Sequence, residues 1–236
     1  MIQLSPRLAA VAAQVRRGAP MADIGTDHAY LPAYLIETGA VPRAIAGDVM
    51  PGPLEAARQT VESAGLADRI ELRLGNGLQV LKPGEATTVT LCGMGGALMA
   101  ELLAAVSLAS IERLVLQPME SPERLRAWLT GHGWRISHEE LVEDAGRIYV
   151  VMAAERGDQH LEPDQLLIGP LLQAAGGEIL QRYSARWIAQ LERAVAGARQ
   201  SDRPEAVARV ATLMEEIALL RAVSARAAEQ EVDRHA

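Results

Sequence analysis

The stretch "ADIGTDHAYLP", residues 22–32, has the pattern of the first strand and turn of a nucleotide-binding α/β fold. A mostly apolar run ends at one glycine, and a short helix-like segment follows it. A loop that binds a pyrophosphate usually carries two or three glycines. This turn has only Gly25 and places Asp23, Asp27 and His28 around it. The stretch therefore predicts a first β-strand followed by a site whose ligand tolerates carboxylates.

The carboxylates of this turn indicate the charge of the ligand. A pyrophosphate needs bare backbone amides at a helix N-terminus. Two carboxylates at about 4–6 Å would oppose it by about 1–4 kcal/mol at an intermediate dielectric. S-adenosylmethionine has no phosphate, and its sulfonium and ammonium groups are attracted by carboxylates. The turn therefore favours S-adenosylmethionine and makes a nicotinamide oxidoreductase the least favoured enzyme class.

Two further segments offer what a ribose and an adenine require. Asp48 ends the second predicted strand, 23 residues after Gly25, a spacing that suits a carboxylate accepting both ribose hydroxyls. In "GNGL", residues 75–78, Asn76 can accept from the adenine amine and Leu78 can cover the ring. Ligands of doubly wound sheets bind beyond the C-terminal ends of the strands. We therefore expect these segments and the opening turn to meet in one site.

The order of the predicted elements gives the fold class. Strand-like runs alternate with helix-like segments up to about residue 133, and a final pair of runs reads as an antiparallel hairpin. The runs are 20–25, 43–49, 70–75, 87–93, 113–118, 134–143 and 146–155. This alternation predicts a Rossmann-like α/β methyltransferase fold, a seven-stranded sheet with helices on both faces.

The pattern changes after the hairpin. Residues 164–236 hold no strand-like run, and apolar residues recur at helical spacing on both sides of "RQSDRPE", residues 199–205. This predicts a C-terminal α-helical hairpin or short coiled coil. We therefore expect a methyltransferase domain at 1–157 and a helical coiled-coil domain at 158–236.

Composition excludes several classes of protein. The chain has a net charge of −7 and no apolar run near the roughly 20 residues that span a bilayer. Residues 178–236 carry nine arginines and nine acidic residues, so the acidity belongs to the rest of the chain. Cys92 is the one cysteine, and the five histidines lack metal-ligand spacing. We expect a cytoplasmic protein without membrane segment, disulfide or metal.

Each residue of the turn also has a purely structural interpretation. Asp23 can cap the turn, and Asp27 can be the N-cap of the following helix. His28 can be a packed or hydrogen-bonded residue rather than a base. Tyr30 can be a core tyrosine whose hydroxyl finds a partner. Cys92 reads better as a small buried residue at a strand end than as a nucleophile.

The assembled motifs resemble one family, the bacterial tRNA adenine-22 N1-methyltransferases. The stretches that carry the resemblance span nearly all of residues 4–155. They are "RLAAVA", "ADIGTDHAYLP", "AIAGDVMPGPLEAA", "LRLGNGL", "CGMGGALM", "RLVLQP", "LRAWL" and "GRIYVV". The helical tail matches the family's C-terminal coiled coil in kind.

The resemblance implies S-adenosylmethionine as cofactor and N1 of an adenine in the D-arm region of tRNA as target. It places Asp27 and Tyr30 at the target base and Arg7 on the RNA-facing surface. With Asp23 and Val49 added from the adjoining turns, the residues expected to bind the cofactor are Asp23, Gly25, His28, Asp48, Val49, Asn76, Gly77, Gly93 and Met94.

The resemblance also leaves the role of the tail open between an RNA-binding arm, a dimerisation hairpin and a lid. Arg182 and Arg186, four residues apart, are the expected RNA contacts of an arm. We expect a monomer or a weak homodimer through the helical tail.

Two positions depart from the family's pattern. Asn76 stands where the family usually has Asp, and its carbonyl oxygen can still accept from an adenine amine. Met119 stands where the family often has Asn after "LQP", which removes an amide that could orient the target base.

The expected chemistry is in-line attack of adenine N1 on the sulfonium methyl, after the base leaves the RNA stack. Tyr30 would stack on the base, and Asp27 would accept from its exocyclic amine as positive charge develops. "CGMGG" replaces the Asn/Asp-Pro-Pro-aromatic motif of many amino-group methyltransferases, which favours a ring nitrogen. The alternatives are a small-molecule methyltransferase and a non-catalytic module that binds the cofactor and recruits partners.

Overall fold

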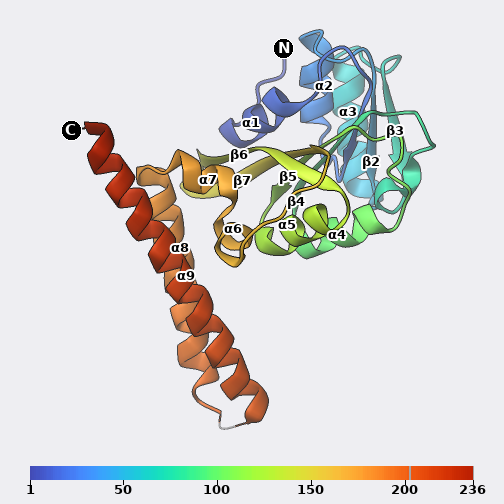
Figure 1. The fold of residues 1–236 in the computed structure, drawn as a ribbon. Helices are drawn as coiled ribbons and strands as arrows, with labels where there is room; N and C mark the ends of the chain where they lie inside the picture. Colours follow the sequence, from blue (N-terminus) through green and yellow to red (C-terminus); the bar gives the residue numbers. More distant parts are fainter. Residues whose placement is uncertain (202, 236) are drawn as a thin grey trace. The chain divides into compact units, whose positions relative to one another are not determined.

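The computed structural model in Figure 1 describes the backbone of residues 1–201 and 203–235, with side chains at 1–201 and 203–228. The chain forms two compact units, Met1–Gln159 and His160–Ala236. The sequence predicts the boundary between residues 157 and 158. Each unit has its own set of elements.

The first unit contains a seven-stranded sheet in the order β3-β2-β1-β4-β5-β7-β6. Strands β1 to β5 are parallel, and β7 pairs antiparallel with both β5 and β6. The strands are β1 Met21–Ile24, β2 Ala44–Asp48, β3 Ile70–Leu74, β4 Thr88–Met94, β5 Arg113–Pro118, β6 Trp134–Asp144 and β7 Arg147–Arg156. The predicted seven-stranded fold with a closing antiparallel hairpin is confirmed.

Helices cover both faces of this sheet (Figure 1). Helices α1, α2 and α3 pack on one face, where their apolar stripes join strand side chains in the main core. Helices α4 and α5 pack against each other on the opposite face. The bounds are α1 Pro6–Gln14, α2 Tyr30–Glu37, α3 Pro51–Ser63, α4 Gly96–Ala104 and α5 Pro122–Gly131, with a 3₁₀ turn η1 at Gly77–Val80.

A two-residue turn closes the β6–β7 hairpin. Asp144 pairs with Arg147, so Ala145 and Gly146 form the turn. Their φ angles of 48° and 75° are those of a type I′ turn, whose twist matches that of the flanking strands. The sequence therefore predicts the hairpin correctly.

The second unit is helical. It contains α6 Pro163–Ile168, α7 Pro170–Ala175, α8 Glu178–Ala198 and α9 Pro204–His235. Helices α8 and α9 pack along each other as the predicted helical pair (Figure 1). The short helices α6 and α7 are absent from the sequence prediction. Within the described residues, no helix is both long enough and apolar enough to span a membrane.

A partly buried ion pair fixes the segment that follows β3. Both guanidinium Nη atoms of Arg73 donate to the carboxylate of Glu85, at 2.5 and 2.9 Å, and Nη1 also donates to the Val80 carbonyl at 2.7 Å. These bonds, with the Lys82 amide, lower the pKa of Glu85 to about 2. The pair ties the end of η1 to β3, next to the predicted adenine-binding residues.

Replacing Glu85 with Gln should lower the free energy of unfolding by about 1 kcal/mol at pH 7. The folded-state pKa lies below the ordinary value, so the carboxylate stabilises the protein above about pH 4.5 and loses this effect as the pH falls toward 2. Urea unfolding of the two proteins should therefore converge toward pH 2. Glu55→Gln, which removes an exposed pair with Arg58, should change stability by less than about 0.5 kcal/mol. A Glu85 variant as stable as wild type at pH 7 would contradict the prediction.

Candidate active site

A cavity of about 860 Å³ lies at the C-terminal ends of β1, β2 and β4. Except for Leu78, it is lined by the site residues that the sequence predicts within the first unit: Arg7, Asp23, Gly25, Asp27, His28, Tyr30, Asp48, Val49, Asn76, Gly77, Gly93 and Met94. The two remaining predicted residues, Arg182 and Arg186, lie on α8 in the second unit. The segments chosen from the sequence thus meet in one place.

The turn after β1 is held in an unusual backbone conformation. Gly25, Asp27 and Ala29 have φ angles of 75°, 52° and 55°. A Cβ on Gly25 would lie 2.1 Å from the Cε atom of Met94, so the glycine permits close packing against β4. Left-handed conformations at Asp27 and Ala29 cost energy and persist where the surroundings enforce them, often at functional sites.

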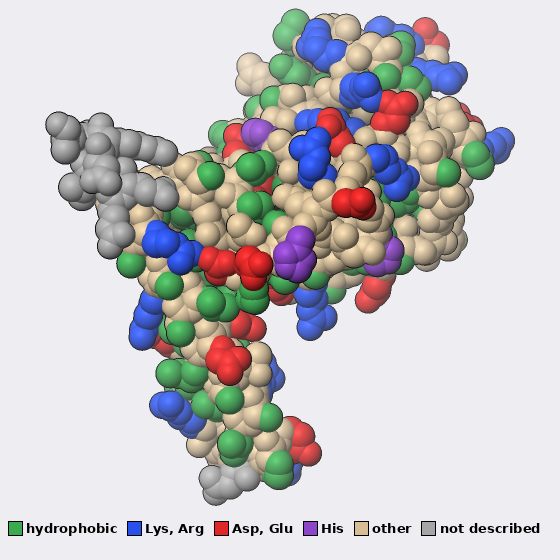
Figure 2. Space-filling model, viewed as in Figure 1, with side chains coloured by type: hydrophobic (Ala, Val, Ile, Leu, Met, Phe, Trp, Pro, Cys, Tyr) green, Lys and Arg blue, Asp and Glu red, His purple; other side chains and the backbone are tan. Residues whose placement is uncertain are grey.

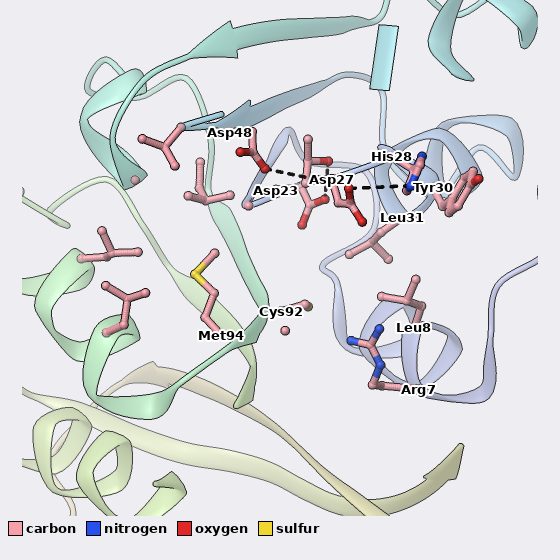
Figure 3. A pocket seen from close by; sticks show the side chains of 18 of the residues that line it. Arg7, Leu8, Asp23, Asp27, His28, Tyr30, Leu31, Asp48, Cys92 and Met94 are labelled. Atoms are coloured by element: carbon pink, nitrogen blue, oxygen red, sulfur yellow. Dashed lines mark hydrogen bonds and ion pairs between the residues drawn. The ribbon is translucent and has the colours of Figure 1, made fainter. Parts of the chain in front are cut away.

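The structure excludes the helix-cap interpretation of Asp27. Helix α2 begins at Tyr30, its N-cap is Ala29, and no side chain caps it. The Asp27 carboxylate is 68% exposed and lies 3.7 Å from Nε2 of His28. It therefore faces the cavity instead of the helix end (Figure 3).

Asp23 has a different environment from the other acids of the site. It is 5% exposed and accepts hydrogen bonds from the hydroxyls of Thr90, at 2.5 Å, and Thr26, at 2.7 Å. Burial raises its pKa, against the effect of the two hydrogen bonds. Asp23 therefore joins the turn to β4, and its negative charge is disfavoured. The attraction for a cationic ligand must come mainly from Asp27 and Asp48.

Asp48 connects the loops after β1 and β2. One carboxylate oxygen accepts from the Met50 amide at 2.9 Å, and the other accepts from the Asp27 amide at 3.4 Å. The exposed Val49 follows it at the edge of the cavity. The carboxylate is thus held in place by backbone donors while it lines the cavity.

His28 and Tyr30 form an exposed aromatic pair. Their ring centroids are 5.2 Å apart with planes 9° from parallel, and Tyr30 is 44% exposed. The interpretation of Tyr30 as a core residue is wrong, because its side chain lies exposed at the cavity, where the His28 ring packs against it (Figure 3). The pair offers a flat surface on which a base can stack.

The apolar wall differs from the prediction. Leu78 is 2% exposed and is not among the lining residues, so it cannot cover an adenine ring. Leu98 and Leu102 of α4 line the cavity with Asn76 instead. Gly77 lies so close to α4 that a Cβ there would be 2.5 Å from Leu102. The sequence signal for this wall is the apolar helix that begins directly after "CGMGG".

Gln117, which contacts two residues that line the cavity, is a residue that the sequence interpretation missed. It is fully buried, and its Oε1 atom accepts from the Arg7 guanidinium and from the Gly93 amide. Its Nε2 atom donates to the Pro118 carbonyl at 3.0 Å. The signal was one amide in the otherwise apolar strand "RLVLQP". Arg7, expected on the RNA-facing surface, lines the cavity beside this amide.

Two other residues at this end of the cavity have limited chemical roles. Burial raises the pKa of the Cys92 thiol, which keeps it protonated and argues against a nucleophile. Met119, the departure from the family pattern, is 45% exposed, with its sulfur 3.7 Å from the Gln117 amide nitrogen. Among the described residues, no group of three or more His, Cys, Asp or Glu side chains could hold a metal ion.

Comparison with known proteins agrees with this geometry. A family model described as "Methyltransferase domain" matches residues 4–152. The tRNA (adenine(22)-N(1))-methyltransferase of Bacillus subtilis strain 168 is 39% identical over 199 residues, which cover 81% of this chain and 82% of that protein.

Solved structures extend the likeness into the helical second unit. The B. subtilis M1A22 tRNA methyltransferase TrmK has a TM-score of 0.87 and 34% identity, with 95% of this chain and 100% of that chain covered. M. capricolum TrmK, solved in complex with its cofactor product S-adenosyl-homocysteine, has a TM-score of 0.81 and 27% identity, with 94% and 98% covered. The chain therefore belongs to the bacterial tRNA (adenine-22-N1)-methyltransferase family.

Proposed function

We propose that this protein transfers a methyl group from S-adenosylmethionine to N1 of adenine 22 in the D-arm region of tRNA. Family membership supports the reaction. The observation that carries it is that one cavity brings together Asp48, Asn76 and the turn after β1. This turn presents the exposed carboxylate of Asp27 and the exposed aromatic pair of His28 and Tyr30. The first unit would carry out catalysis, and the helical unit would contact the tRNA.

The cofactor would lie along the C-terminal edge of the sheet. Asn76 would accept from the adenine amine, with Leu98 and Leu102 against the ring, and Asp48 would accept from the ribose hydroxyls. Gly25 and Met94 would approach the sulfonium closely, because both line the cavity and the absence of a Cβ at Gly25 lets the Met94 methyl group pack against the turn. The remaining predicted cofactor residues, Asp23, His28, Val49, Gly77 and Gly93, line the same cavity.

The target adenine would enter beside the opening turn. Adenine N1 lies on the Watson–Crick edge, so the base must leave the RNA stack before transfer. Tyr30, supported by the His28 ring, would stack on the base. Asp27 would accept from the exocyclic amine and stabilise the cationic product as it forms. The bound cofactor would supply the methyl group, and the chain's own residues would orient both reactants.

Nucleoside analysis of modified tRNA tests this function. The protein is incubated with unmodified tRNA and S-adenosylmethionine carrying a labelled methyl group, and the digested nucleosides are identified by mass spectrometry. We expect labelled 1-methyladenosine, and none when adenine 22 is replaced by guanine. Label in a different nucleoside would contradict the target atom. Binding of the cofactor without transfer to any tRNA would support the non-catalytic alternative, and transfer to free metabolites would support a small-molecule enzyme.

The helical unit would contribute cationic contacts to the tRNA backbone. Arginine and acidic side chains are interspersed along it (Figure 2). The double variant Arg182→Gln/Arg186→Gln should weaken tRNA binding. The slope of the logarithm of the association constant against the logarithm of the salt concentration should become shallower by about 1–2, because fewer phosphate contacts form and fewer counterions are released. Fluorescence anisotropy at several salt concentrations measures this slope. Arg199→Gln, at the C-cap of α8 and on another side of the helix, serves as the control. An unchanged slope would show that these two arginines do not contact the tRNA backbone.

A further inference from the structure

The segment that precedes α1, residues 1–5, forms part of the cavity wall. Gln3 and Ser5 line the cavity, whereas Ile2 and Leu4 are partly buried and pack against the main core. This alternation is typical of an extended chain, in which successive side chains point to opposite sides. Gln3 therefore presents its side chain to the cavity while its two neighbours hold the segment on the core.

Hydrogen bonds fix the segment on both sides of Gln3. The Ile2 backbone N–H donates to the carboxylate of Glu37, the last residue of α2, at 2.7 Å. Ser5 caps α1, because its hydroxyl oxygen accepts from the Leu8 backbone N–H. The side-chain amide of Gln3 is exposed and has no hydrogen-bond partner among the described residues. Its NH₂ group and its carbonyl oxygen are therefore available to a ligand.

Gln3 lies on the side of the cavity that the proposed function gives to the target base. The cofactor's ribose is placed at Asp48, at the end of β2. The segment that carries Gln3 is instead attached to α1 and α2. Figure 3 shows Leu8 of α1 and Leu31 of α2 on the same side of the cavity as Tyr30. Gln3 thus belongs with the aromatic surface on which the base would stack.

The contact proposed for Asp27 does not by itself identify adenine. A carboxylate accepts from the 6-amine of adenine, and it accepts equally well from the 4-amine of cytosine. Adenine is distinguished by its Hoogsteen edge, where the amine is a donor and N7 an acceptor. The amide of a glutamine matches this edge with one acceptor and one donor. Reading this edge also leaves N1, on the Watson–Crick edge, free to react.

We propose that Gln3 reads the Hoogsteen edge of the target adenine, with its carbonyl oxygen accepting from the exocyclic amine and its NH₂ group donating to N7. The proposal deepens the proposed function and rests on it. The amine has one hydrogen beside N1 and one beside N7, so Asp27 and Gln3 accept from it together. Methylation at N1 spreads positive charge onto the amine, and both contacts strengthen as that charge develops.

Transfer to tRNA with 7-deazaadenine at position 22 tests the proposal, because this base has a C–H group in place of N7 and keeps N1 and the amine. Single-turnover rates at subsaturating tRNA and saturating S-adenosylmethionine give the ratio of adenine to 7-deazaadenine for the full-length protein. Gln3→Leu cannot contact N7, so its ratio measures the intrinsic reactivity of the two bases. The wild-type ratio should exceed it by about 5–20-fold. Gln59→Leu, which replaces an exposed glutamine of α3 outside the cavity, should keep the wild-type ratio.

Gln3→Glu gives a readout of opposite sign. Glutamate keeps an acceptor for the amine but brings a carboxylate oxygen against the N7 lone pair, so its ratio should fall below that of Gln3→Leu. The Kd for S-adenosylmethionine, measured by calorimetry, should stay within about threefold of wild type in each variant.

Two results would overturn this inference and leave the proposed function standing. One is an equal ratio in wild type and Gln3→Leu, with normal transfer to adenine 22. The other is a loss of cofactor affinity in Gln3→Leu as large as its loss of rate, which would make Gln3 a cofactor contact. Absence of transfer by wild type to any tRNA would instead overturn the proposed function itself.

Discussion

Replacing Asp27 with Asn should lower the single-turnover rate of methyl transfer by about 10²–10³-fold and change the Kd for S-adenosylmethionine by less than about threefold. Methylation at N1 makes the adenine cationic, so a carboxylate that accepts from the exocyclic amine is worth more in the transition state than in the ground state. An amide keeps the acceptor oxygen but loses the charge. The effect should therefore fall on the rate and leave cofactor binding nearly intact.

The conformation of residue 27 makes this substitution a clean test. Asp27 has a φ angle of 52°, and Asn is among the non-glycine residues that adopt this region most readily. The turn should therefore keep its shape, and the backbone N–H of residue 27 should still donate to the Asp48 carboxylate. Asp68→Asn, an exposed acid outside the cavity, is the matched control and should match wild type. Equal losses of rate and of cofactor affinity would show that Asp27 shapes the turn and does not stabilise the transition state.

The sequence predicts the sheet well because strand signals there are local. Short apolar runs bounded by glycine, proline or charged residues coincide with the parallel strands. The longer runs of β6 and β7 flank a hairpin turn that carries its own backbone signal at Gly146. The helices α6 and α7 could not be found in this way. Each has six residues, too few to show an apolar period.

The sequence predicts only part of the site, because some of its features depend on how distant elements pack. Residues at strand ends were identified because parallel strands bring their C-terminal ends together. The cavity wall depends on how helices pack, so Leu98 and Leu102 replaced the expected Leu78. Charge also depends on burial: Asp23 counts as an acid in the sequence, yet its surroundings disfavour the ionised form.

Replacing Gly96 with Ala should lower the free energy of unfolding by about 2–4 kcal/mol. A Cβ at this first residue of α4 would lie 2.2 Å from the Ser121 carbonyl oxygen and 3.0 Å from its carbonyl carbon. These are backbone atoms, so no side-chain rotation relieves the overlap. The loop cannot shift freely either, because the Gly96 amide donates to the Glu120 carbonyl at 2.8 Å and Ser121 already has a φ angle of 51°.

Gly52→Ala is the matched control for this collision. Gly52 lies in the first turn of α3, and the Cβ that alanine would add meets no described heavy atom within 4 Å beyond its chain neighbours and the backbone of its own helix. Its stability should stay within about 1 kcal/mol of wild type, on the stabilising side, because alanine suits a helix better than glycine. Urea unfolding at pH 7 compares the three proteins. A Gly96 variant as stable as the Gly52 variant would contradict the prediction. It would show that residues 119–121 can move away from α4 at no cost in stability, and that the contact between this loop and α4 is not rigid.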